Sequence, residues 1–208
     1  MHQSSLGTLI VVMGVQISPL WQTQLIPLHF LLTAIVIGYG VVLFESCVAA
    51  SAYRRKIEMH LLEPLAKIML GMLAVFLVIR FGDLIVRGAL PLAFKGNLVA
   101  AAFWVEMLCF FAPFALIGSA PARRNPAKLF LAGTAIMLGG IFMRLNAFLI
   151  GYDTGVGVDD GWRYFPSVPE LLVTIGMFAI EVIGYIIITR RFPVLPREDA
   201  GLANSAAH

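Results

Sequence analysis

Five long apolar stretches dominate this 208-residue chain and restrict the folds that are open to it. They cover about residues 25–49, 61–87, 97–119, 128–150 and 168–189. Each reaches the roughly 20 apolar residues that a helix needs to cross a bilayer. Backbone groups inside hydrocarbon must be hydrogen-bonded internally, so such stretches form helices. The sequence therefore predicts an all-α integral membrane protein, a single domain with a bundle of five transmembrane helices.

Composition excludes a soluble domain and argues against a nucleic-acid partner. The chain is 60% hydrophobic and 13% charged, whereas soluble domains are about half apolar and about a quarter charged. Its net charge is +3, but the basic residues form short clusters between apolar stretches. This is the pattern of membrane topology rather than of a binding face.

Those basic clusters predict the orientation of the chain. They follow the first, third and fifth stretches, and their members are Arg54, Arg55, Lys56, Arg123, Arg124, Lys128, Arg190, Arg191 and Arg197. By the positive-inside rule these segments are cytoplasmic, so we expect the N-terminus outside and the C-terminus inside, with residues 193–208 as a cytoplasmic tail. Trp21, Trp162 and Tyr164 then fall at the outer boundary, where aromatic belts occur.

Ionisable residues inside the apolar stretches are candidate functional groups, because charge is costly in hydrocarbon. Arg80, Asp83 and Arg87 follow one another at i, i+3 and i+7, which places them on one helix face. This strip is interpreted either as a structural salt bridge or as a site where an arginine holds a ligand. The two interpretations are compatible.

Glu106 lies in the middle of the third stretch, within AAFWVEMLCFF, and has no charged neighbour in sequence. Arg144 and Asn146 of the fourth stretch are candidate partners. Two interpretations remain open, a carboxyl group that carries a proton and a structural ion pair between Glu106 and Arg144.

The remaining groups suggest a proton-transfer ladder across the membrane. It would run from His2 and His29 outside, through Asp83 and Glu106, to Glu181 and Glu45 inside. Two simpler alternatives remain, namely that Glu45 is an interfacial acid and that His29 is a hydrogen-bonded structural residue.

Several cofactors and reactions are not predicted for this chain. Cys47 and Cys109 are isolated, so the sequence predicts neither an iron–sulfur cluster nor a zinc site. No two histidines lie inside apolar stretches, so no haem is predicted either. No phosphate-binding loop, serine-hydrolase motif or HExxH motif is present.

Four segments together resemble a known family: HQSSLGTL, SPLWQTQLIPLHFLL with Glu45 after it, RFGDLI, and WRYFPSVPE. They are similar to the membrane subunit of Hyb-type nickel–iron hydrogenases, within the NrfD-like superfamily of polysulfide reductase membrane subunits. The resemblance covers essentially the whole chain. Gln24 stands where the family pattern has a proline.

The resemblance implies a function and partners. Such subunits sit in the bacterial inner membrane and dock a periplasmic ferredoxin-like iron–sulfur subunit beside the large and small hydrogenase subunits. They pass electrons to menaquinone while buried acids move protons. Here His2 and Glu45 match positions proposed for proton transfer, a role that histidine suits because it titrates near neutral pH. We expect Arg80, His29 and Arg144 to contact the quinone.

Family members are about twice as long, with about ten spans. We therefore expect this chain to be the C-terminal half of a longer architecture, lacking its N-terminal half. Alternatives are a subunit of a polysulfide, sulfite or nitrite reductase, a proton channel or transporter, and a simple membrane anchor whose charges are structural.

Overall fold

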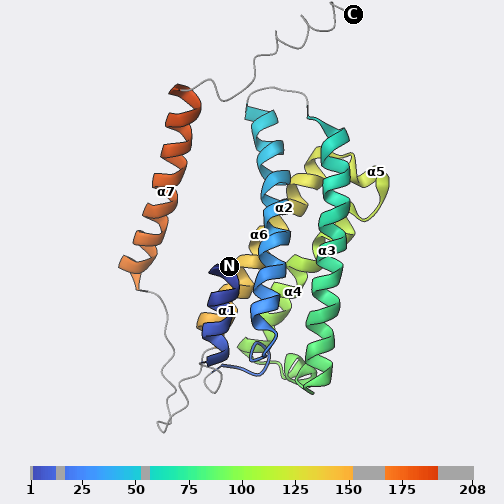
Figure 1. Ribbon diagram of the computed structural model, residues 1–208, viewed down its shortest axis with the longest axis vertical. Helices are drawn as coiled ribbons and strands as arrows, with labels where there is room; N and C mark the ends of the chain where they lie inside the picture. Colours follow the sequence, from blue (N-terminus) through green and yellow to red (C-terminus); the bar gives the residue numbers. More distant parts are fainter. Residues whose placement is uncertain (1, 13–16, 53–56, 152–166, 192–208) are drawn as a thin grey trace, which may run out of the picture. The chain divides into compact units, whose positions relative to one another are not determined.

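The structure is a computed structural model that describes residues 2–12, 17–52, 57–151 and 167–191 (Figure 1). The chain divides into two compact units, Met1–Arg163 and Tyr164–His208. Residues Trp162 and Tyr164, the segment 54–56 and the tail 193–208 lie outside the described residues. The predicted orientation of the termini and the single-domain organisation remain predictions.

Five described helices are long and apolar enough to cross a membrane, which confirms the predicted fold class in this respect. They are α2 (Ile26–Ala52), α3 (Met59–Val86), α4 (Leu98–Ile117), α6 (Pro126–Leu145) with its π-helical extension η3 (Asn146–Ile150), and α7 (Val168–Arg191). Three shorter helices complete the described elements: α1 (His2–Val12), the 3₁₀ helix η2 (Leu90–Phe94) and α5 (Ala120–Arg123).

In the first unit, α2, α3, α4 and α6 run side by side as an up-and-down bundle (Figure 1). Helix α2 packs against α1, α3 and α6, and α4 packs against α6. We call the end of the bundle where α2 begins and α3 ends the Trp21 end, and the opposite end the Cys47 end. Helix α1 lies beside the half of α2 that is nearer the Trp21 end, where Gly7 touches the backbone of Pro27.

The bundle helices end where the sequence supplies capping and turn residues. The Asn97 side chain accepts a hydrogen bond from the Ala100 amide at the start of α4, and Asn125 does the same for Ala127 and Lys128 at the start of α6. Gly88 and Gly96 flank η2 with φ angles of +65° and +67°. Glycine adopts that conformation without steric cost, so the chain can turn sharply from α3 into α4.

Glycines let α2 and α6 approach closely. A Cβ atom added to Gly133 would lie 2.7 Å from the carbonyl oxygen of Gly40, and one added to Gly40 would lie 2.9 Å from a side-chain carbon of Ile136. Small residues at a helix crossing allow the backbones to meet, which is the usual way in which membrane helices associate. The α2–α6 contact therefore depends on the absence of side chains at these two positions.

The outward faces of the bundle are apolar, as a bilayer requires. Val78 and Leu108 are 72% and 70% exposed. Helix α7 is exposed over nearly all its described length, with Phe178 at 64%. Continuous apolar surface of this kind is stable when lipid or other membrane helices cover it.

Replacing Gly133 with valine should lower the thermal stability of the detergent-solubilised chain, because the new methyl groups collide with backbone rather than with a flexible side chain. We expect a loss of about 1–3 kcal/mol, typical of overpacking, measured as a lower melting temperature. The matched control is Gly71→Val on α3, where an added Cβ meets nothing within 4 Å. Equal melting temperatures for the two variants would contradict the close α2–α6 approach.

Candidate functional site

The candidate site lies at one level of the bundle because of how α3 and α4 are connected. Arg80 is six residues before the end of α3, and Glu106 is eight residues after the start of α4. At 1.5 Å per residue, both lie roughly 9–12 Å from the turn that joins the antiparallel helices. The sequence separation of 26 positions thus becomes a contact inside the bundle.

Arg80 and Glu106 form a fully buried ion pair. The Nη2 atom of Arg80 lies 3.9 Å from Oε1 of Glu106, and both side chains have 0% exposure. The Arg80 guanidinium also lies over the ring of Phe103, 5.9 Å from its centroid. A pair at this depth loses the hydration of two charges, so each charge depends on the other for compensation.

The other carboxylate oxygen of Glu106 accepts two hydrogen bonds. The indole Nε1 of Trp21 donates to Oε2 at 3.0 Å, and the Nδ2 of Asn146 donates to the same atom at 2.9 Å. Asn146 also donates to the carbonyl oxygen of Ala102. The cluster of Glu106, Arg80, Trp21 and Asn146, hereafter the Glu106 cluster, therefore joins four separate parts of the chain.

Local structure places Trp21 and Asn146 in this cluster. Asn146 begins the π-helical turn η3, and such turns often occur at functional positions. Gly151, directly after η3, leaves room for the indole, because an added Cβ would lie 2.9 Å from the Trp21 ring. The carbonyl of Gly151 accepts a hydrogen bond from the Ser18 amide, which holds the Trp21 segment against the end of α6.

A second ionic group, centred on Asp83, lies at the Trp21 end of the bundle. Arg87 donates to Oδ2 of Asp83 at 2.6 Å, and Thr23 donates to Oδ1 of the same carboxylate at 2.8 Å. Arg87 also donates to the carbonyl oxygens of Pro19 and Gln22. This group, hereafter the Asp83 group, fastens the segment before α2 to the end of α3. The predicted strip on one face of α3 therefore forms two separate ion pairs. Asp83 pairs with Arg87, and Arg80 pairs with Glu106 of α4.

His29 is buried near these groups but is not bonded to them. Its side chain has 0% exposure and packs edge-on against Phe76, one turn before Arg80 on α3. Both ring nitrogens lack a hydrogen-bond partner among the described residues, as do the three guanidinium nitrogens of Arg80. His29 and Arg80 therefore offer buried polar atoms that remain able to bind a polar group.

Arg144 faces α1 and not Glu106. It donates to the side-chain oxygen of Gln3 and to the carbonyl of Gly140, and it lies 5.4 Å from the ring centroid of Phe30. The alternative of a Glu106–Arg144 ion pair was therefore wrong, while Asn146 is confirmed as a partner of Glu106. Two of the expected quinone contacts therefore have different partners, since Arg80 pairs with Glu106 and Arg144 binds Gln3 of α1.

The other members of the predicted ladder are not brought together. His2 is exposed at the start of α1, and Glu45 is exposed on α2 without a described partner. Glu181 is exposed on α7, in the second unit. Their proposed proton-transfer roles remain predictions.

Sequence reasoning misplaced Trp21 and did not identify Thr23 or Gln3. Trp21 was expected in the interfacial belt, but it is 0% exposed. The available signal was the polar run SPLWQTQ before the first span, which is long enough to fold back over the bundle. A tryptophan buried there needs a partner for its N–H group, and Glu106 provides it.

The apolar helices and the buried polar cluster define a multi-pass α-helical membrane protein. No protein-family model matches the chain. It is 38% identical over 199 residues to the probable Ni/Fe-hydrogenase 2 b-type cytochrome subunit of Escherichia coli (strain K12), covering 94% of this chain and 50% of that protein. It is also 28% identical over 204 residues to a protein of Nitratidesulfovibrio vulgaris (strain Hildenborough), covering 94% of this chain and 51% of that one. The chain spans about half the length of these relatives.

The Escherichia coli relative corrects one prediction. Its name describes a b-type cytochrome subunit, and b-type cytochromes are haem proteins. The prediction that this chain has no haem is contradicted by that relative and is withdrawn.

The described histidines fit a haem only in part. His29 has the unpartnered ring nitrogens that an axial ligand needs, but it is fully enclosed and packed against Phe76. His2 and His60 are exposed at the starts of α1 and α3, so His29 is the one histidine buried within a described span. A haem held by two histidines needs a second ligand, and no second histidine is buried within a described span.

Replacing Trp21 with phenylalanine tests the Glu106 cluster, because it removes the N–H donor and keeps a ring. A hydrogen bond to a buried charged group contributes about 1.5–3 kcal/mol, so the melting temperature should fall clearly. The matched control is Trp104→Phe, which removes a bond to the carbonyl of Ala93 from a side chain that is 39% exposed. A loss for Trp21→Phe no larger than the loss for Trp104→Phe would contradict the arrangement.

Proposed function

We propose that this chain forms part of the membrane subunit of a respiratory nickel–iron hydrogenase, which passes electrons from hydrogen oxidation to a quinone. The observation that carries this proposal is the 38% identity with the Escherichia coli hydrogenase 2 subunit across 94% of the chain. The five apolar helices suit the membrane component of such a complex.

The complex needs components that this chain does not contain. We infer that a periplasmic ferredoxin-like iron–sulfur subunit delivers electrons from the large and small hydrogenase subunits. The chain spans half of its relative, and we infer that further helices, an N-terminal half, complete the subunit in a bacterial inner membrane.

In this proposal the Trp21 end contains the quinone-reactive region. Arg80 and His29 have unpartnered nitrogens that suit the carbonyl oxygens of a menaquinone. Both side chains are fully enclosed, so the quinone would reach them only after local rearrangement. Arg144 binds Gln3 on α1, which directly follows His2, and so would act from a separate position near the outer histidine.

Quinone reduction consumes protons as well as electrons, and we infer that carboxyl groups on the spanning helices take part in supplying those protons. Asp83 and Glu106 lie at successive depths at the Trp21 end, with Arg80 next to Glu106. Glu45 is an exposed carboxylate 19 residues into α2. A carboxylate on a spanning helix is costly in lipid, which supports a functional role for it. We infer that Glu181 of α7 belongs to the same route.

Replacing Glu45 with glutamine in the complete complex tests this proposal. The change keeps size and removes the titrating group, so hydrogen-driven quinone reduction should fall by roughly 100-fold, as for loss of a proton-transfer group. Hydrogen oxidation with a soluble dye should continue unchanged, because it does not pass through the membrane subunit.

The matched control is Glu58→Gln, an exposed acid at the start of α3 outside the span. It should reduce quinone at the normal rate. Normal quinone reduction by the Glu45 variant would remove Glu45 from the mechanism. Failure of the complete, unaltered complex to reduce quinone with hydrogen would overturn the proposed function itself.

A further inference from the structure

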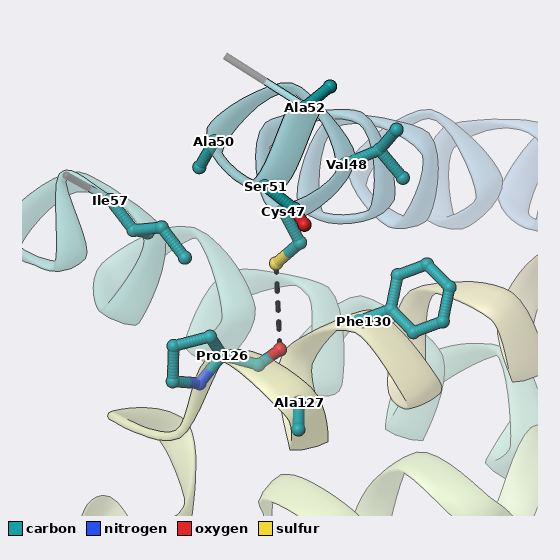
Figure 2. A pocket seen from close by; sticks show the side chains of 9 residues that line it. All are labelled: Cys47, Val48, Ala50, Ser51, Ala52, Ile57, Pro126, Ala127 and Phe130. Atoms are coloured by element: carbon teal, nitrogen blue, oxygen red, sulfur yellow. Dashed lines mark hydrogen bonds between the residues drawn. The ribbon is translucent and has the colours of Figure 1, made fainter. Parts of the chain in front are cut away.

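An aromatic pair, Phe94 and Trp104, lies on the outside of the bundle at its Trp21 end. The centroids of the two rings are 5.4 Å apart, and the side chains are 67% and 39% exposed. The Cys47 end differs, because a cavity of about 690 Å³ with mainly apolar walls lies there between the last turns of α2 and the first turn of α6 (Figure 2). The proposed electron and proton transfer uses neither feature.

The turn between α3 and α4 holds both rings in place. The Nε1 atom of Trp104 donates to the carbonyl oxygen of Ala93 at 2.9 Å, and Ala93 is buried. The Trp104 ring also packs edge-on against the buried ring of Phe103. Phe94 directly follows Ala93 at the end of η2. The backbone that buries Ala93 therefore also holds the Phe94 ring outside the bundle.

The aromatic pair continues the outward face of α4. Trp104, Leu108 and Phe111 follow one another at i, i+4 and i+7, so they share one helix face. All three are exposed, Leu108 by 70% and Phe111 by 43%. Leu108 lies roughly 15 Å along α4 from its first residue, inside a helix that is long and apolar enough to cross a membrane. A soluble partner bound beyond the end of α4 would cover the turn but not this face.

The chemistry of the pair suits lipid better than another helix. Tryptophan is enriched where the hydrocarbon of a bilayer meets the headgroups. The N–H group of Trp104 is already bonded to Ala93, so the indole needs no polar partner from a neighbouring helix. Its exposed ring and that of Phe94 present apolar surface, which is stabilised when acyl chains remove it from water.

We propose that Phe94 and Trp104 lie at the boundary between acyl chains and headgroups and fix the depth of the Trp21 end in the bilayer. Glu106 follows Trp104 by two residues, which places it roughly 3 Å deeper along α4 and about 200° around the helix. It therefore faces the inside of the bundle, where it is buried. The Glu106 cluster then lies just inside the hydrocarbon and not at the bilayer centre. This lipid contact does not depend on which redox partner the chain serves.

Tryptophan fluorescence of the full chain in phosphatidylcholine liposomes tests this proposal. The lipid carries bromine, a quencher of tryptophan, either near the headgroup or near the end of the acyl chain. Trp162→Phe leaves two tryptophans, of which Trp21 is 0% exposed. The Trp104 emission is the difference between this chain and the same chain with Trp104→Phe. Shallow bromine should quench it about twofold or more as strongly as deep bromine.

Two further variants test whether Phe94 fixes the depth. Phe94→Ala removes the more exposed ring, so the shallow-to-deep quenching ratio should move toward one. The matched control is Leu108→Ala, farther along the same face of α4, which should leave the ratio unchanged. An unchanged ratio for Phe94→Ala would overturn the role of Phe94 as an anchor.

Two results with the Trp162→Phe chain would overturn the proposal as a whole. Stronger quenching by deep bromine would place the aromatic pair inside the hydrocarbon. Quenching by neither lipid would show that protein or water surrounds the pair instead of lipid.

Discussion

The carboxylate of Glu106 is enclosed in an apolar bundle, and its partners explain how the Trp21 end is assembled. Burying an unpaired charge at that depth costs several kcal/mol or more of free energy, so the fold must place an opposite charge and hydrogen-bond donors beside it. Arg80 supplies the opposite charge, while Trp21 and Asn146 satisfy the other carboxylate oxygen. Three helices and the segment before α2 are thereby fixed relative to one another.

Two sets of hydrogen bonds hold the segment before α2 in place. Trp21 ties it to α4 from within the bundle, and Arg87 ties the carbonyls of Pro19 and Gln22 to the end of α3. Asp83 orients Arg87 and also accepts the Thr23 hydroxyl. The Glu106 cluster and the Asp83 group therefore support each other, and a ligand that reached Arg80 would have to displace well-packed structure. The same rigidity suits a site that must hold reacting groups in fixed positions.

The sequence predicted the helices well because long apolar runs have few alternatives in a membrane. Contacts between helices were harder to predict from the sequence, because they depend on which face of each helix points into the bundle. Arg144 and Asn146 were both candidate partners of Glu106, but residues two apart point about 200° from each other on a helix. Only Asn146 can face α4, and Arg144 turns to α1 instead. Trp21 could not be placed, because its burial depends on a segment that folds back on the bundle.

The central claim is that Arg80 and Glu106 compensate each other, and a double-mutant cycle on the unfolding free energy of the detergent-solubilised chain tests it most directly. Arg80→Leu and Glu106→Gln should each destabilise the chain by about 3–5 kcal/mol, because each leaves a group buried without its partner. The double variant should be more stable than the sum of the two losses implies, with a coupling of about 1–3 kcal/mol. Strictly additive losses would contradict the account.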